Sequence, residues 1–482
     1  MQPTALLFAL FGPLALPLIF WLYRNYKILL AGEGNDEKKN DRLAHDRGRL
    51  RAGIEGRKFE ARYLHLLGRF LDWLTRFTKD REALAASGAR DSWRVRLFGI
   101  DPFTEGGYLL CLRLAFFYPV AGFFLGWALG GGGEFSGIEF LPPEEAAWRR
   151  WLLLGGIGSF GWLLFKSNRT EGWISLAYSI LAVAVAAAFA GAGAVAGAGA
   201  VAGAVAFAGA GAGAFAVAVA VAFAVAFAVA SEWSRDRLRS ARNIATYWLG
   251  FNLFFVSYLL LAIGWALPRI PDEKASVLLL PVFLGLLPLA NAALDWLSLG
   301  VTRGLLYAIR RGHHSGIMAL AWALADILLA FVFLFAIVSL ATGLLAGLNA
   351  LAFAWGGRTL LDLGALFAGL AREPGAREFW WIHFMMLSTL LPTLAHFFIA
   401  GGAAALILPD SWRRWILASF DRSDDARWGA FLYASFVPLL ALAAPVGLLW
   451  GLYLSITAHH GAVGMALLNW ARGIAALLDP WL

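Results

Sequence analysis

The chain has 482 residues, of which 60% are hydrophobic and only 15% are charged, and its formal net charge is +8. Ordinary soluble domains carry about 25% charged residues, so this composition argues against a soluble globular protein. The positive charge does not indicate nucleic-acid binding, because lysine and arginine accumulate on the cytoplasmic side of membrane proteins.

The apolar residues come in blocks of about twenty, which is the length that a helix needs to cross a bilayer. We therefore predict an all-α fold, a polytopic transmembrane helical bundle of about ten spans. The predicted spans cover residues 4–23, 107–129, 150–166, 173–200, 203–230, 245–268, 275–298, 316–340, 381–407 and 430–456.

The first span is expected to be an N-terminal membrane anchor over residues 1–23. It contains Pro13 and Pro17, and it has neither a basic residue ahead of it nor a clear small-residue cleavage site, which a cleavable signal peptide would need. Residues 24–106 are then expected to form a basic cytoplasmic segment, and residues 107–482 the transmembrane bundle.

Lysine and arginine are distributed unevenly over the loops between the predicted spans. One alternating set of loops, counted with Lys166, holds 31 of them, and the other set holds eight. Since basic residues mark the cytoplasmic side, we expect a multi-pass protein of the cell inner membrane with both termini on the non-cytoplasmic side.

Within the cytoplasmic segment, the sequence RKFEARYLHLLGRFLDWLTRFTKD predicts an amphipathic helix over residues 57–79. Apolar residues recur there at steps of three and four, as one helical face requires; they are Phe59, Tyr63, Leu66, Phe70, Leu74 and Phe77. Basic residues between them suit contacts with lipid headgroups, anionic ones included; they are Arg57, Lys58, Arg62, Arg69, Arg76 and Lys79. The alternative is a helix docked on the protein's own cytoplasmic face. Membrane lipids are thus the expected partners, a protein partner or a second copy stays open, and no nucleic acid is expected.

Residues 173–230 form an apolar block in which alanine alternates mostly with Gly, Val and Phe from residue 182 onward. As one helix the block would be about 87 Å long at 1.5 Å per residue, too long for one crossing of a ~30 Å core. We predict a hairpin of two spans. Three GxxxG spacings favour close helix packing: Gly193 with Gly197, Gly199 with Gly203, and Gly209 with Gly213. The alternative is an expanded dipeptide repeat that fills the membrane without a specific role.

The run FLDWLTRF, followed by SWRVRLFGIDPFTEGGYLLCLRLAFFYPVAGFFLGWALGG and then by this Gly/Ala/Val/Phe block, resembles a group of uncharacterised bacterial polytopic membrane proteins. The resemblance covers roughly residues 57–230. No activity is attached to the group, so the resemblance implies no particular function.

Ionisable residues inside predicted spans are the first candidates for function, because a charge in the membrane is costly. Asp326 lies ten residues into its span, and His396 lies near the centre of another. Pro392 cannot donate a backbone hydrogen bond, which leaves the carbonyl of Ser388 for another partner. These three groups predict a cation or proton site, and the alternative is a structural hydrogen bond between neighbouring helices. Asn291 and Asp295 are further candidates nearer the cytoplasm, where Asp295 would pair with arginines or meet water.

The sequence contains no nucleophile motif, no HExxH and no paired carboxylates placed for acid–base catalysis. We therefore predict no catalytic residues, no metal site and no cofactor. The interpretation that we favour is a non-catalytic membrane component, a scaffold or effector. The alternative is an ion or small-solute transporter or channel that uses Asp326 and His396, and a membrane-embedded lipid or glycan enzyme has the least support.

Overall fold

The computed structural model describes residues 19–30, 37–78, 97–98, 100–128, 133–135, 138–141, 282–312, 317–374, 410–419, 424–457 and 461–478, with parts of 249–263, 376–382 and 395–402. Several predictions lie outside these residues: the spans 150–166, 173–200 and 203–230, the six glycines of the GxxxG pairs, Ser388 and Lys79.

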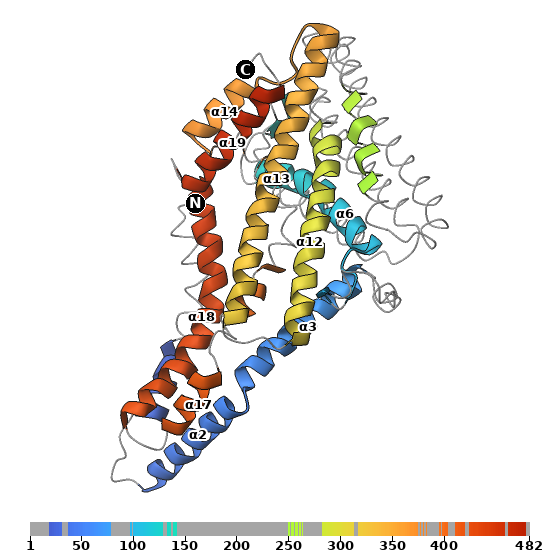
Figure 1. The fold of residues 1–482 in the computed structure, drawn as a ribbon. Helices are drawn as coiled ribbons and strands as arrows, with labels where there is room; N and C mark the ends of the chain where they lie inside the picture. The colour runs from blue at the N-terminus through green and yellow to red at the C-terminus, as the bar shows by residue number, and fades with distance from the viewer. Residues whose placement is uncertain are drawn as a thin grey trace, which may run out of the picture. The chain divides into compact units, whose positions relative to one another are not determined.

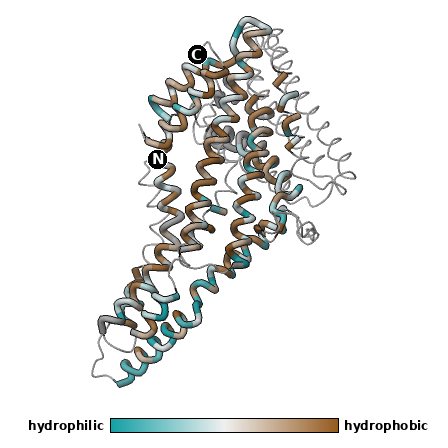
Figure 2. Tube along the Cα trace, in the orientation of Figure 1, coloured by the Kyte–Doolittle hydropathy of each residue, from teal (hydrophilic) through white to brown (hydrophobic). Residues whose placement is uncertain are grey.

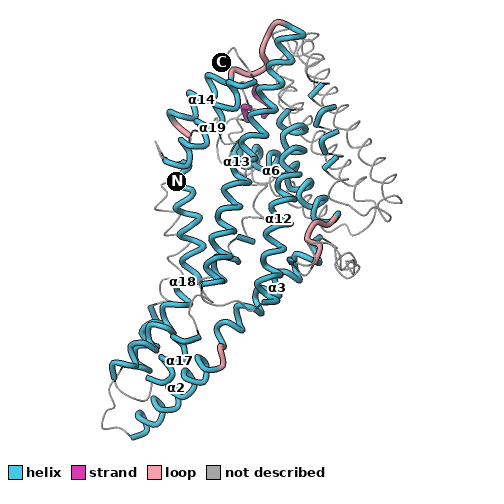
Figure 3. The backbone as a smooth tube through the Cα atoms, viewed as in Figure 1, coloured by secondary structure: helices cyan, strands magenta, loops and turns pink. Residues whose placement is uncertain are grey.

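The described part of the chain is helical apart from one short hairpin (Figure 3), which confirms the all-α class. The helices are α2 (Glu37–Glu55), α3 (Lys58–Thr78), α6 (Glu105–Ala128), α12 (Leu287–Gly312), α13 (Ile317–Gly356), α14 (Leu363–Arg372), α17 (Asp410–Ser419), α18 (Asp424–Thr457) and α19 (Ala462–Leu478), and the π-helical turn η3 (Val282–Leu286) precedes α12. The hairpin pairs β1 (Gly133–Phe135) with β2 (Ile138–Leu141) in antiparallel register.

The chain divides into two compact units. Unit 1 comprises residues 1–102, 301–330 and 393–452, and unit 2 comprises residues 103–300, 331–392 and 453–482. The domain boundaries at residues 23 and 106 stay a prediction.

One described helix is long and apolar enough to cross a membrane, the Leu320–Gly356 part of α13. Figure 2 shows α13 as hydrophobic over most of its length, whereas α2 is largely hydrophilic. A second candidate is α18, if its segments Arg427–Ala441 and Val446–Ile456 form one span with a bend between them. Pro445 lies in that bend and cannot donate a hydrogen bond to the preceding turn, a common cause of helix kinks. The larger number of spans therefore stays a prediction.

Helix α13 extends well beyond the span predicted over residues 316–340. It ends only at a glycine pair, where Gly357 has a φ of +69° and its N–H bonds the Phe353 carbonyl at 2.8 Å. A left-handed glycine is the usual end of a helix. The buried Asn349 then holds the next turn of chain, because its side-chain oxygen accepts the N–H groups of Leu360 and Leu361 at 3.1 Å each.

The environment of α13 changes along its length. Large apolar side chains in its first half are exposed: Met318, Leu320, Leu324, Leu328, Phe331 and Val332. In its last third, Leu345, Ala346, Leu348 and Ala352 are buried. The early part thus leaves an apolar stripe uncovered, whereas one side of the late part packs against the protein as far as Ala352.

Two further boundaries differ from the sequence prediction. Part of the loop expected over residues 299–315 is helical, since α12 continues to Gly312. The residues after 456, expected to be a tail, contain the amphipathic helix α19, whose buried side chains are Leu467, Leu468, Ala471 and Ala475. Helix α14 lies beside α19 (Figure 1).

Candidate functional site

Asp326 of α13 and His396 form a hydrogen-bonded pair inside unit 1. Nδ1 of His396 lies 2.8 Å from Oδ1 of Asp326. The Asp326 side chain is 4% exposed and the His396 side chain 18%, so the imidazole is the more accessible partner. An ionised carboxylate only accepts hydrogen bonds, so Nδ1–H of the histidine is the donor when Asp326 is charged. The two residues that the sequence singled out are thus brought together.

The pair lies beside an apolar cluster that limits contact with water. Ala395 and Ile399, on either side of His396 in the chain, are fully buried in this cluster, and Trp322 and Leu329 of α13 pack against it. A hydrogen bond in such surroundings is stronger than in water, and the loss of one partner leaves a costly buried polar group. The geometry can therefore hold a proton between the two side chains or contribute ligands to a cation.

The position of Asp326 in its helix differs from the expectation. A span ending at residue 340 placed this carboxylate near the bilayer centre, but Asp326 is the tenth of the 40 residues of α13. Moreover, Tyr63 of α3 donates a hydrogen bond to the Phe398 carbonyl, two residues after His396. The pair thus lies towards one end of α13 and close to the segment that carries the basic helix.

Asn291 and Asp295 form a second buried polar pair, within unit 2. The Asn291 side-chain amide donates to Oδ2 of Asp295 at 3.2 Å. Asp295 is 0% exposed, so its side chain is out of reach of bulk solvent within this chain. The same region contains Asn252, which donates to the Tyr108 hydroxyl at 2.9 Å and to the Leu289 carbonyl at 2.7 Å. These contacts join three segments of unit 2.

The apolar face of α3 is docked on the protein, which was the alternative to a lipid-facing helix. Leu67, Phe70 and Leu71 are buried in the cluster beside His396, and they pack there with Phe98, Leu305, Leu306, Ile309, Ala395 and Ile399. Phe70, the one of these three that the sequence assigned to the apolar face, is therefore docked on the protein. Leu66, assigned to the same face from its spacing, is instead 55% exposed, because the buried stripe is centred on Leu67 and Leu71.

The basic residues of α3 fall into two groups. Lys58, Arg62, Arg69 and Arg76 are exposed, together with Leu66 and Trp73. Arg57 is different, because its side chain is engaged within the protein. The composition of the exposed group suits contact with lipid headgroups. Arg57 instead forms an ion pair within the protein.

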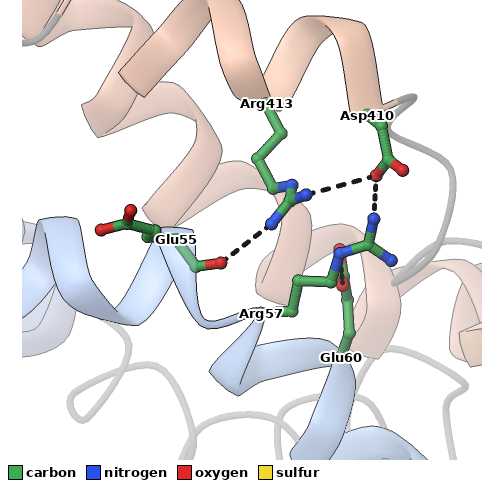
Figure 4. A network of polar contacts seen from close by, with 5 residues as sticks. All are labelled: Glu55, Arg57, Glu60, Asp410 and Arg413. Atoms are coloured by element: carbon green, nitrogen blue, oxygen red, sulfur yellow. Dashed lines mark hydrogen bonds and ion pairs between the residues drawn. The ribbon is translucent and has the colours of Figure 1, made fainter. Parts of the chain in front are cut away.

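Arg57 belongs to a polar network that links α3 to α17 (Figure 4). Its guanidinium forms an ion pair with Asp410, the first residue of α17, and its Nε lies 3.6 Å from Oε2 of Glu60. Arg413 donates to the Glu55 carbonyl at 2.9 Å and lies 3.6 Å from Asp410. The network therefore closes the turn between α2 and α3 against the start of α17.

Two details of this network have physical consequences. Arg57 has a φ of +51°, a left-handed conformation that is unfavourable for residues other than glycine, asparagine and aspartate. Burial raises the pKa of the Glu60 carboxyl above its ordinary value, although Arg57 and Arg413 act in the opposite direction. Desolvation thus outweighs the two nearby positive charges.

The sequence interpretation missed this network, and it also missed Arg303. Arg303 of α12 is 1% exposed and donates to the Thr75 hydroxyl of α3 at 3.2 Å. Both features join residues more than 200 positions apart, so no local pattern reports them. The amphipathic period of α3 did indicate that one of its faces needs a partner.

Among the described residues, no group of three or more His, Cys, Asp or Glu side chains is placed to hold a metal ion. Comparison of the chain with protein-family models, with curated proteins and with solved structures finds no match.

Proposed function

We propose that the chain is a multi-pass, bacterial inner-membrane protein in which Asp326 and His396 bind a proton or a small cation. The function that this site supports best is ion transport, as an ion-coupled transporter or a channel. The observation that carries the proposal is the 2.8 Å contact between the two side chains, because the sequence separates them by 70 positions.

The membrane setting of this proposal is supported by exposed apolar side chains. On α13 they lie at steps of three and four, at Leu320, Leu324, Leu328 and Phe331, so they share one helical face. A large apolar patch left uncovered on a soluble protein would promote aggregation, whereas lipid covers it at no cost. Asp326 lies within the same apolar helix but is only 3% exposed, so its carboxylate avoids that face.

The energetics also favour a functional pair over an accidental one. A charged carboxylate within a membrane helix costs about 2.5–3.5 kcal/mol even on the lenient insertion scale. A hydrogen bond to a charged group returns about 1.5–3 kcal/mol, so the pair offsets most of this cost without removing it. Leucine at the same position would avoid the cost entirely, which is a reason to expect a role beyond packing.

Flux measurements on the full-length protein in liposomes test the proposal. Wild type should carry a pH-dependent ion flux, and Asp326→Asn should reduce it at least tenfold while the melting temperature changes little, because asparagine preserves the shape. Asp72→Asn, at an exposed carboxylate of α3, is the matched control and should leave the flux unchanged. If Asp326→Asn carried the wild-type flux, the contact between Asp326 and His396 would be a structural hydrogen bond without a role in transport.

A non-catalytic scaffold or effector is the second candidate, and the exposed face of α3 favours it. That face combines four basic residues with the exposed Leu66 and Trp73, a composition suited to anionic headgroups or to an acidic protein surface. If wild type carries no flux in liposomes but α3 gains hydrogen-exchange protection in anionic nanodiscs, this second function is supported instead.

A further inference from the structure

Three helices line a partly open apolar cavity within unit 2, which the proposed ion site does not use. Helices α13, α14 and α19 supply most of its wall, and the cavity has a volume of about 180 Å³. The lining includes Ala341 and Leu345 of α13, Phe367 and Leu370 of α14, and Leu467 of α19. Among the described lining residues, Thr342 carries the one polar side chain.

Specific contacts join the helices that form the walls of this cavity. Nε1 of Trp470 donates to the Ser339 hydroxyl at 2.7 Å, and the Trp470 ring meets Phe335 edge to face, which attaches α19 to α13. Nη2 of Arg472 donates to the Phe367 carbonyl at 3.3 Å, which attaches α19 to α14. The Asp362 side chain caps the first turn of α14 by accepting the Ala365 N–H at 2.8 Å. The cavity is thus framed by polar contacts, while its interior remains apolar.

A charged side chain bonded to the cavity wall indicates what kind of molecule the cavity fits, since Arg472 donates to the carbonyl of the lining residue Phe367. Arg472 is exposed, and it follows Ala471, which lines the cavity. Its guanidinium has five N–H donors, and their planar arrangement matches a carboxylate or phosphate. Arg372 of α14 is also exposed, but it is followed directly by the exposed Glu373, which offsets its charge. Arg472 is therefore the better contact for an anion.

We propose that this cavity binds one acyl chain of an anionic amphiphile, with the chain between α13, α14 and α19 and the acidic head at Arg472. An apolar cavity of this order takes apolar ligands, and its partly open side lets a chain enter from outside. The acyl chain would find few polar groups to desolvate, because Thr342 has the one polar side chain among the described lining residues. The site lies within unit 2, so it does not rest on the Asp326–His396 proposal.

Photolabelling of the full-length protein in detergent tests the site. The probe is palmitate with a diazirine in its chain, and its cross-links are mapped by mass spectrometry. Labelling should concentrate in residues 337–345, 363–371 and 461–471. Ala341→Phe fills the cavity and should lower this labelling at least tenfold, whereas Ala354→Phe, at an exposed position of the same helix, should not change it.

The head contact is tested separately from the chain contact. Arg472→Gln should weaken labelling by palmitate several-fold but leave labelling by the matching uncharged alcohol unchanged, and Arg372→Gln should affect neither. If Ala341→Phe fails to fold, Ala371→Leu narrows the same cavity from α14. Labelling spread evenly over all apolar helices, or undiminished by a folded cavity-filling variant, would overturn the proposal.

Discussion

Arg57 and Asp410 form an ion pair that joins the turn between α2 and α3 to the first residue of α17. Asp410 also lies where the partial positive charge of a helix N-terminus favours an acid. Both side chains are more than a third exposed, so water screens the pair. The contact therefore orients α17 more than it stabilises the fold.

A double-mutant cycle between Arg57→Gln and Asp410→Asn should give a small coupling energy. We expect about 0.5 kcal/mol, the usual value for a partly exposed pair, measured as the free energy of unfolding in detergent. The same cycle with the exposed Arg62→Gln in place of Arg57→Gln should give none. A coupling energy of zero for Arg57 would mean that the ion pair does not persist in solution.

Glu60 should make stability depend on pH. Because burial raises its pKa, the folded protein binds this proton more tightly than the unfolded chain does. The resulting stabilisation is present below the ordinary pKa and is lost as pH rises through the raised value. Glu60→Gln imitates the protonated form, so its melting temperature should exceed that of wild type increasingly as pH rises from about 4 to 7. Glu37→Gln, at the exposed start of α2, should show no such trend.

Gly304 permits close packing of Phe98 on α12. A Cβ atom at Gly304 would lie 2.7 Å from the Phe98 ring, closer than atoms can approach. Gly304→Ala should therefore lower stability by about 1–3 kcal/mol. Gly48 in α2 has nothing within 4 Å of the same hypothetical atom, so Gly48→Ala should instead raise stability by about 0.5–1 kcal/mol. Equal effects of the two substitutions in thermal unfolding would contradict this packing.

The orientation of the chain can be read by reporter fusions. From the excess of lysine and arginine in one set of loops, fusions after residue 90, near 237 and near 310 should report the cytoplasm. Fusions after residue 140 and at the C-terminus should report the other side. A cytoplasmic C-terminus would mean that the orientation or the even number of spans is wrong.

Much of the helical pattern could be predicted, since hydrophobic period and block length are local signals. The helix predicted over residues 57–79 corresponds to α3, and the span predicted over 430–456 falls within α18. The length of α13 was not predicted. The predicted span was ended at residue 340, at the length of one membrane crossing, whereas the apolar sequence and the helix continue to the glycine pair. Helix α19 was missed because Asn469 and Arg472 interrupt its apolar run, so the segment did not resemble a membrane span.

For the candidate site, the sequence predicted which residues take part but not where they lie. Rare ionisable residues in apolar helices pointed to Asp326 and His396, and both are found in one contact. The depth of Asp326 in the membrane could not be derived, since it depended on the assumed end of its helix at residue 340. The partners of Arg57 and Arg303 could not be derived either, because ion pairs between distant segments leave no periodic trace in a sequence.

The change of environment along α13 has a consequence for a helix that crosses a bilayer. Its stretch Leu320–Gly356, with 37 residues, would extend about 55 Å, against a hydrocarbon thickness of about 30 Å, a mismatch that the usual tilts of up to about 40° do not absorb. Part of the helix must then leave the hydrocarbon while still apolar. In the last third, one side of the helix packs against the protein, at Leu345, Ala346, Leu348 and Ala352. A membrane-spanning α13 would therefore contact acyl chains along its uncovered stripe and the protein's own side chains at Leu345, Ala346, Leu348 and Ala352.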